Sequence, residues 1–245
     1  MIKHVAGNTL ITINLIIVLM LSSCGTKIVS KEGKEIPSQL DSYSINQLAK
    51  TDLDRLADVQ MRETTESLKL LMVKLYKRNP NELKKSTSGS VDDMVAWVFQ
   101  GGHHWQFDDL KGSQGVDAIQ LAFKADFQKD RVLAYIVGLQ TMIIKASGGK
   151  TEFYMTDSID PQKIYNAARN VEVAYWKLTN ARDSNGQLYL LTNEMNDHER
   201  NLSFEREIGK IIGRLDLYAF TLAEKYQRMI TRVTQSIATA IFIPL

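Results

Sequence analysis

Residues 132–144, with the sequence VLAYIVGLQTMII, contain no charged side chain. A helix that crosses a bilayer needs about 20 apolar residues, so this run is too short to span a membrane. A helix that is apolar on every side is usually buried at the centre of a protein. The pair Gly148-Gly149 follows the run and is typical of a helix end. We therefore predict a central buried helix around which the other segments pack.

Helical patterns continue on both sides of this run. Apolar residues recur every three or four positions over residues 45–78, but residues 60–67 are polar, so one long helix and two shorter helices both remain open. Ser90 and Asp93 have the spacing of a capping box. Asp160 and Pro161 combine a capping side chain with proline at the first helical position. These signals predict helices after each pair.

The clearest apolar repeat begins at Phe204 and continues to Ile241, which predicts a last helix over residues 204–241. Gly209 and Gly213 lie one turn apart in it and predict a close crossing with a neighbouring helix. Residues 238–245 are interpreted as the end of this core helix rather than as a partner site. Residues 151–156 and 187–192 are the candidate strands of one short β-ribbon. The expected fold is an all-α, multi-helix globular bundle with at most that ribbon.

Composition supports a packed domain and offers little sign of a charged partner. The chain has 245 residues, of which 44% are hydrophobic, and 30 Lys and Arg against 28 Asp and Glu. A balance so close to zero gives no reason to expect a nucleic-acid partner. No sequence motif indicates a cofactor, and a small-molecule ligand cannot be named from the sequence.

The first 23 residues have the layout of an export signal, with Lys3 before an apolar stretch at residues 10–21. Leu21-Ser22-Ser23-Cys24 follows directly and resembles the lipobox of bacterial lipoproteins. The resemblance implies cleavage before Cys24, a diacylglycerol on its thiol and a third acyl chain, such as palmitate, on its amine. Cys24 is the only cysteine, so no intramolecular disulfide can form.

The lipobox implies a cellular address and a domain layout. Gly25 stands where lipoproteins retained in the inner membrane often carry Asp, which favours the outer membrane facing the periplasm, with the inner membrane as the alternative. We expect a signal peptide at residues 1–23, a lipidated cysteine and flexible polar tether at residues 24–43, and a single helical domain at residues 44–245.

The second half of the chain also resembles uncharacterised proteobacterial envelope lipoproteins. The resemblance rests on TEFY at residues 151–154, DPQK at 160–163, YNAARN at 165–170 and NLSFER at 201–206. It implies an envelope location and carries no established activity.

A metal site is one candidate for chemistry. His103, His104 and Asp108 offer imidazole and carboxylate ligands that suit zinc. Adjacent histidines point in different directions unless the loop gathers them, so a solvated or capping loop is the commoner interpretation.

Catalysis by a carboxyl group is a second candidate. Enzymes that cleave murein use a glutamate with a raised pKa, and Glu152 beside Phe153 and Tyr154 is the candidate acid. An ordinary surface carboxylate is the commoner interpretation of such a residue.

A polar strip on the helix after Asp160 is the third candidate. Its residues are Lys163, Asn166, Arg169 and Asn170. Such a strip can hydrogen-bond a neighbouring loop or a partner, and a structural network is commoner than a ligand site. Because no catalytic constellation is recognisable, we expect a non-catalytic envelope adaptor that binds another envelope protein. A murein hydrolase or lyase and a periplasmic metal-binding protein remain the alternatives.

Overall fold

The computed structural model describes residues 50–154, 158–195, 200–227, 229–231 and 241–245, together with two short strands near the N-terminus. The chain divides into two units, Met1–Ala49 and Lys50–Leu245. In the first unit, β1 (Ile28–Val29) pairs antiparallel with β2 (Glu35–Ile36), a pairing that the sequence analysis did not predict. The predicted signal peptide and Cys24 lie outside the described residues.

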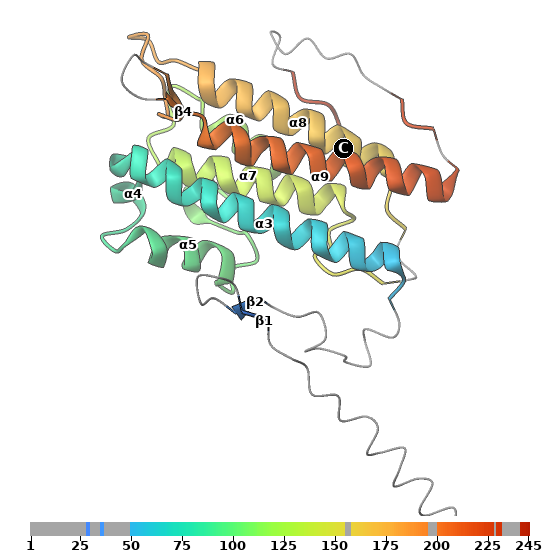
Figure 1. Cartoon of the computed structure of the whole chain (residues 1–245). Helices are drawn as coiled ribbons and strands as arrows, with labels where there is room; N and C mark the ends of the chain where they lie inside the picture. Colours follow the sequence, from blue (N-terminus) through green and yellow to red (C-terminus); the bar gives the residue numbers. More distant parts are fainter. Residues whose placement is uncertain are drawn as a thin grey trace, which may run out of the picture. The chain divides into compact units, whose positions relative to one another are not determined.

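The second unit is helical, as predicted (Figure 1). Its helices are α3 (Asp52–Arg78), α4 (Pro80–Ser86), α5 (Val91–Gln100), α6 (Gly115–Leu121), α7 (Arg131–Ala146), α8 (Pro161–Asn180) and α9 (Ser203–Tyr226). A short 3-10 helix, η2 (Asp108–Leu110), precedes α6, and the strands β3 (Glu194–Met195) and β4 (Arg200–Asn201) pair antiparallel before α9.

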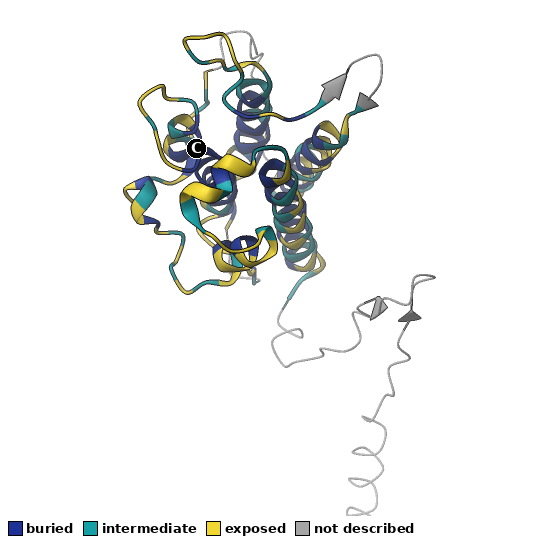
Figure 2. Cartoon of the chain, turned by 90° about the vertical axis from the view of Figure 1, so that its left-hand side faces the viewer, coloured by how far each residue is buried: buried dark blue, intermediate teal, exposed yellow. Residues whose placement is uncertain are grey.

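Four of these helices form an up-down-up-down bundle. Helix α3 packs against α7, α7 against α8, α8 against α9, and α9 back against α3 (Figure 1). Each neighbour runs antiparallel to the next, which is the usual arrangement when helices pack in sequence order. Helices α4 and α5 cover α3, and α6 covers α7. The buried faces of the helices point inward and the exposed faces outward (Figure 2).

Helix α7 is the central helix that the sequence predicted. Every residue from Arg131 to Ile143 is buried. Helix α6 approaches it closely at Gly138, where an added Cβ atom would lie 2.6 Å from the backbone nitrogen of Ile119. Among the described residues, no helix is both long enough and apolar enough to cross a membrane.

A buried carboxylate begins α7. Asp130 accepts a hydrogen bond from the backbone N–H of Leu133 (2.9 Å), as an N-cap does, and from the hydroxyls of Tyr76 and Ser86 (2.7 Å each). Burial raises the pKa of Asp130, and these three hydrogen bonds oppose that shift. The carboxylate therefore joins the end of α3, the end of α4 and the start of α7.

Helix α3 is one helix, which decides between the two alternatives left open by the sequence. Thr51 and Asp54 form a capping box at its start. Three polar residues in its middle, Gln60, Thr64 and Ser67, are buried against the bundle without breaking the helix, whereas Arg62 and Glu66 are exposed. The amide of Gln140 on α7 donates to the Thr65 hydroxyl (3.2 Å), and Gln60 donates to Thr64 (3.4 Å).

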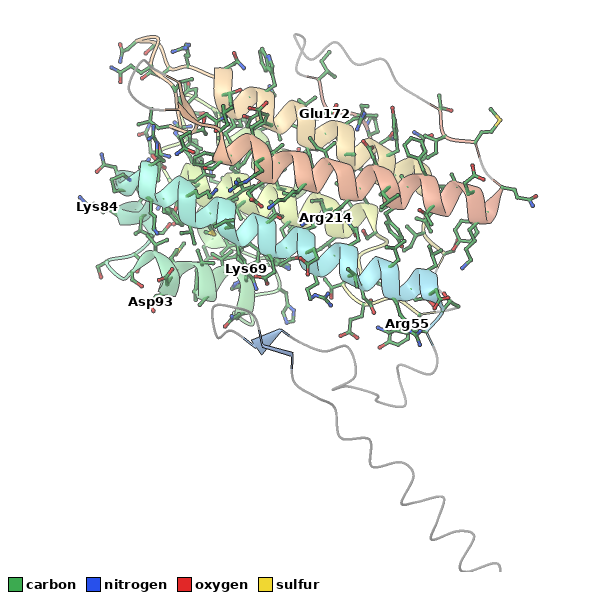
Figure 3. The ribbon with its side chains drawn as sticks, in the orientation of Figure 1. Arg55, Lys69, Lys84, Asp93, Glu172 and Arg214 are labelled. Atoms are coloured by element: carbon green, nitrogen blue, oxygen red, sulfur yellow. The ribbon has the colours of Figure 1, made fainter. Side chains whose placement is uncertain are left out.

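A second polar network joins α3 to α9. The hydroxyl of Ser67 donates to the Glu207 carboxylate (3.3 Å) and accepts from Arg214 (2.9 Å), which lies between the two helices (Figure 3). Lys210 also pairs with Glu207 (2.9 Å). Burial alone would raise the pKa of Glu207, but Lys210, Lys74 and the Ser67 hydrogen bond together lower it below its ordinary value.

The predicted length of the last helix is wrong. Helix α9 ends at Tyr226, where Gln227 adopts a left-handed conformation (φ 51°), and the described residues 229–231 and 241–245 are not helical. A continued helix would place Met229 and Ile241 on the core stripe, but these side chains are 95% and 65% exposed. The interpretation of residues 238–245 as a helix end is therefore wrong for residues 241–245, which lie along α8.

Two further predictions need correction. Gly209 and Gly213 lie on the exposed side of α9, where an added Cβ atom would meet no atom within 4 Å, so the close crossing is at Gly138 instead. In the predicted strand 151–156, residues 151–154 form no strand, because the Phe153 N–H is bound by Asp58 (3.0 Å) and the Phe153 ring enters the core, and residues 155–156 lie outside the described residues. Leu188 makes only an isolated bridge with Arg182, and the ribbon of this unit is β3–β4.

The glycines of α9 and α7 predict opposite effects of the same substitution. Gly209→Ala and Gly213→Ala should each stabilise the protein by about 0.5–1 kcal/mol, because alanine loses less backbone entropy in a helix. Gly138→Ala should destabilise it by about 1–3 kcal/mol, because α6 would have to move. Urea denaturation of the three variants measures these changes, and destabilisation by Gly209→Ala would contradict an exposed position.

The Glu207 network predicts a loss of stability in acid. The pKa of Glu207 is lower in the folded chain than in the unfolded chain, where it has its ordinary value of 4.5. The ionised carboxylate therefore stabilises the fold above pH 4.5, and this contribution is lost as the pH falls through the pKa of the folded state. Thermal denaturation from pH 6 to pH 3 should show a smaller pH dependence for Glu207→Gln than for the wild type. Equal slopes would show that another group dominates the acid response.

Candidate functional site

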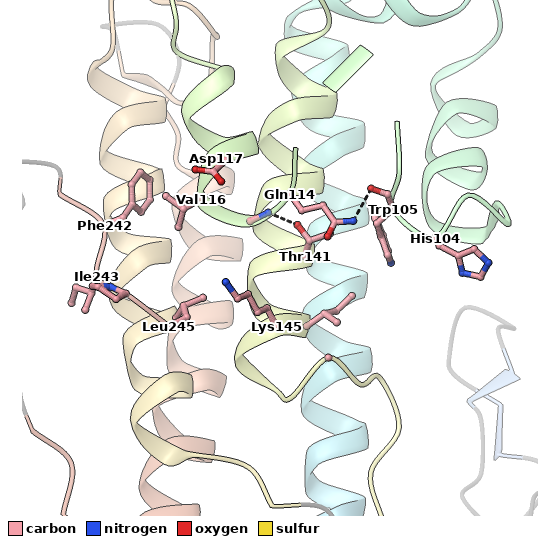
Figure 4. A pocket seen from close by; sticks show the side chains of 14 residues that line it. His104, Trp105, Gln114, Val116, Asp117, Thr141, Lys145, Phe242, Ile243 and Leu245 are labelled. Atoms are coloured by element: carbon pink, nitrogen blue, oxygen red, sulfur yellow. Dashed lines mark hydrogen bonds between the residues drawn. The ribbon is translucent and has the colours of Figure 1, made fainter. Parts of the chain in front are cut away.

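A cleft lies between the bundle and residues 241–245 (Figure 4). It has a volume of about 860 Å³ and lies beside the start of α6, the end of α7 and the loop after α5. Apolar side chains from separate segments line it, among them Trp105, Val116, Ile144, Phe242 and Leu245. His104, Asp117 and Lys145 also line it and are exposed. Apolar walls with charged groups exposed to water suit an apolar or amphipathic ligand.

The inner end of α6 is tied to α7 beneath this cleft. Gly115 has φ +56° and donates its backbone N–H to the hydroxyl of Thr141 (2.7 Å), which in turn donates to the carbonyl of Val137 (2.6 Å). Gln114 donates its side-chain amide to the carbonyl of Trp105 (3.2 Å). Figure 4 shows the Gly115 and Gln114 bonds, which hold the cleft walls in place from the inside.

Side-chain amides of α8 hold residues 241–245 along the other wall. Asn170 makes two hydrogen bonds to Ile243, donating to its carbonyl (2.8 Å) and accepting from its N–H (2.6 Å). Asn166 donates to the carbonyl of Pro244 (2.9 Å). One turn earlier, Gln162 donates to Asn166 (2.9 Å) and makes two hydrogen bonds to the backbone of Thr231 (2.8 and 3.2 Å).

The structure brings together only part of the predicted polar strip. Asn166 and Asn170 lie side by side and are buried beneath residues 243–244. Arg169 instead pairs with Glu172 (3.1 Å) and with Asp216 of α9 (2.7 Å). Lys163 is exposed. The strip therefore binds a segment of the same chain, and Arg169 belongs to the contact between α8 and α9.

The histidine loop uses its first imidazole for structure. Nε2 of His103 lies 2.9 Å from the carbonyl oxygen of Trp97, and Nδ1 accepts from the N–H of Trp105 (3.2 Å), a pattern that fits the tautomer with its hydrogen on Nε2. Its ring packs on Phe107, with centroids 4.2 Å apart. Both ring nitrogens are therefore engaged within the loop.

The predicted metal ligands are not gathered. His104 and Asp108 are exposed, and no group of three or more His, Cys, Asp or Glu side chains in the described residues is placed to hold a metal ion. His198, the remaining histidine of the predicted domain, lies outside the described residues.

The same loop has an unusual backbone. His104 (φ 50°) and Trp105 (φ 61°) are consecutive non-glycine residues in the left-handed region, where each costs on the order of 1–3 kcal/mol. Aromatic packing compensates for this cost, with Trp105 against Phe99 (5.5 Å between centroids). A smaller cavity of about 370 Å³ lies within this loop. Trp105 and His104 line both cavities, so the loop's shape sets one wall of the main cleft.

Glu152 does not have the surroundings expected of a catalytic acid. Its side chain is exposed and accepts a hydrogen bond from the Tyr154 hydroxyl (3.1 Å), which raises the pKa of Tyr154. Glu152 lines neither of the two described cavities. Four carboxyl groups are buried in the described part of the chain, those of Asp54, Glu82, Asp130 and Glu207. Asp54 caps α3, Glu82 accepts from the backbone N–H of Arg131 (2.8 Å), and Asp130 and Glu207 serve the networks described above.

Two parts of the site were not predicted from the sequence. Gln162 lies four positions, or one helical turn, before Asn166. Asn166 and Asn170 have the same spacing, so continuing it toward the start of the helix would have included Gln162. The role of residues 241–245 had no local signal, because their apolar side chains continue the spacing of the preceding helix.

Comparison of the chain with protein-family models, with curated proteins and with solved structures found no match.

The contact between α8 and residues 241–245 predicts a measurable loss of stability. Asn170→Ala should destabilise the protein by about 1–2 kcal/mol, because two hydrogen bonds to Ile243 are lost. Lys163→Ala, on the exposed side of the same helix, should change the stability by less than about 0.5 kcal/mol. Urea denaturation measures both, and equal effects would show that the Asn170 contact adds little.

Proposed function

We propose that this protein is a lipid-anchored, non-catalytic adaptor of the bacterial envelope that binds another envelope protein. The anchor is Cys24, on the strength of the lipobox Leu21-Ser22-Ser23-Cys24. Two or three acyl chains give stable membrane attachment, whereas one gives only reversible binding. Gly25 supports the outer membrane, with the helical domain in the periplasm.

The adaptor proposal depends on the exposed apolar side chains on the outward side of α9. Leu217 is 62% exposed and Phe220 is 37% exposed, and they are three residues apart on one side of the helix. Gly213 and Gly209 continue this side at intervals of four residues, with the exposed side chains of Arg206 and Lys210 beside them. An exposed apolar helix surface is typical of a protein-protein contact.

The position of the acidic groups supports the same proposal. A hydrolase acid of the murein-cleaving kind needs a carboxyl group with a raised pKa inside a cleft. Glu152 is exposed outside both described cavities, and the pKa of Asp130 is raised within a contact between helices. These positions favour a structural role for the acids and a binding role for the surface.

The test is site-specific photo-crosslinking in cells with the full-length, lipidated protein. A photoreactive residue at position 217 should capture one dominant envelope protein, because this side chain would lie within the contact. Position 92, an exposed residue of α5, is the matched control and should not capture it. Leu217→Glu should abolish capture by a photoreactive residue placed at position 220.

The anchor is tested in the same experiment. Replacing residues 1–24 with an export signal that is cleaved without lipidation should move the protein from the membrane to the soluble fraction and weaken capture at position 217, because the protein is no longer held near its partner. Equal capture from positions 217 and 92, or capture of murein alone, would contradict the adaptor proposal.

A further inference from the structure

The α8 surface binds the backbone of two described stretches of the same chain, residues 229–231 and 241–245. Gln162 and Asn170 each use their amide N–H and carbonyl to bind both the N–H and the C=O of one residue, Thr231 and Ile243 respectively. Asn166 binds the next carbonyl, that of Pro244. A side-chain amide offers one acceptor and two donors in a fixed plane, which matches the two polar groups of an extended residue. This recognition does not depend on the side chain of the bound residue.

Residues 242–245 also make apolar contacts with the protein. Phe242 and Leu245 pack against the hydrophobic core at its edge, and both line the cleft (Figure 4). The Lys177 ammonium lies 5.8 Å from the centre of the Phe242 ring, within the range of a cation–π contact. Pro244 has no N–H that would need a partner. The bound pattern is therefore aromatic, aliphatic, proline, aliphatic.

The bound segment leaves space beside it. The cleft of about 860 Å³ lies between this segment and the α6–α7 wall, and apolar side chains line both sides. A larger or longer apolar segment would fill more of this volume than residues 242–245 do. The site thus has one side, on α8, that hydrogen-bonds to a peptide backbone. Its other side, formed by α6 and α7, is apolar and leaves space unfilled.

We propose that α8 and this cleft form a binding site for an extended apolar peptide segment of a partner protein, with the pattern aromatic-aliphatic-proline-aliphatic. Residues 242–245 occupy the site in this structure as an internal competitor. A partner segment binds by replacing them and by making the same hydrogen bonds to Asn166 and Asn170. This site is separate from the outward side of α9 and from Cys24, so either proposal can fail without the other.

The first experiment weakens the internal competitor in the full-length, lipidated protein held in nanodiscs. The double variant Phe242→Ala and Ile243→Pro removes the aromatic contact and the N–H that Asn170 accepts. The ligand is a fluorescent peptide with the sequence of residues 241–245 and three added lysines at its amino end. A tethered competitor acts at an effective concentration of about millimolar. We therefore expect the double variant to bind the peptide at least tenfold more tightly than the wild type in a fluorescence polarisation titration.

Two controls distinguish binding at this site from non-specific binding of the peptide. Adding Asn170→Leu to the double variant should weaken peptide binding at least tenfold, because both hydrogen bonds are lost. A peptide carrying proline in place of the residue corresponding to Ile243 should also bind at least tenfold more weakly. Equal affinity of the wild type and the double variant, or no effect of Asn170→Leu, would overturn the proposal.

A second measurement uses the otherwise unmodified chain and does not depend on the double variant folding. A fluorinated phenylalanine at position 242 reports the surroundings of that ring by ¹⁹F NMR. Excess peptide should move its resonance to that of a solvent-exposed ring, whereas an unchanged resonance would overturn the proposal. If instead the protein forms dimers that Asn170→Leu abolishes, the occupant is a second copy of this chain and the partner proposal is overturned.

Discussion

Helix α7 carries no charge from Val132 to Ile144, and its whole surface must be covered by other parts of the protein. A single neighbour covers only part of a helix, so α3, α8 and α6 are all needed. The close approach of α6 at Gly138 shows how little space is left there. The bundle order follows from this requirement, because α9 then closes the remaining side between α3 and α8. The polar contacts lie at the edges of this core, where Asp130 and Glu207 join helix ends and helix sides through satisfied hydrogen bonds.

Local signals in the sequence were sufficient for much of the helical framework. The capping pairs at Ser90 and Asp160 begin α5 and α8, and the uncharged run is α7. Each depends on residues within a few positions of one another, so a sequence pattern contains it. The polar middle of α3 was ambiguous because its hydrogen-bond partner Gln140 lies on another helix. No local pattern distinguishes a polar residue that breaks a helix from one that faces a neighbour.

The errors at the end of the chain have the same origin. Apolar spacing continues beyond Tyr226, but the left-handed Gln227 ends the helix and the following apolar residues serve an extended segment. The side chains that hold this segment, Asn166 and Asn170, were identified as a polar strip without the segment they bind. The two glycines of α9 have the spacing of a close crossing, yet they face outward. Whether such a pair is buried depends on which side of the helix meets the bundle, and that is a property of the whole fold.

The hydrogen bonds between α3 and α9 join residues that are far apart in the sequence. Ser67 and Glu207 are 140 residues apart, whereas Tyr76 and Asp130 are 54 apart. Closing a longer loop costs more conformational entropy before any contact compensates for it, so the α3–α7 contact has the entropic advantage in forming early. Arg169 of α8 and Asp216 of α9 are only 47 residues apart, so the α8–α9 contact shares this advantage. Until α9 docks on α3, the apolar sides of these two helices that meet in the bundle are open to water. The interval between these two events is when a chain of this topology is most exposed to aggregation and to proteases.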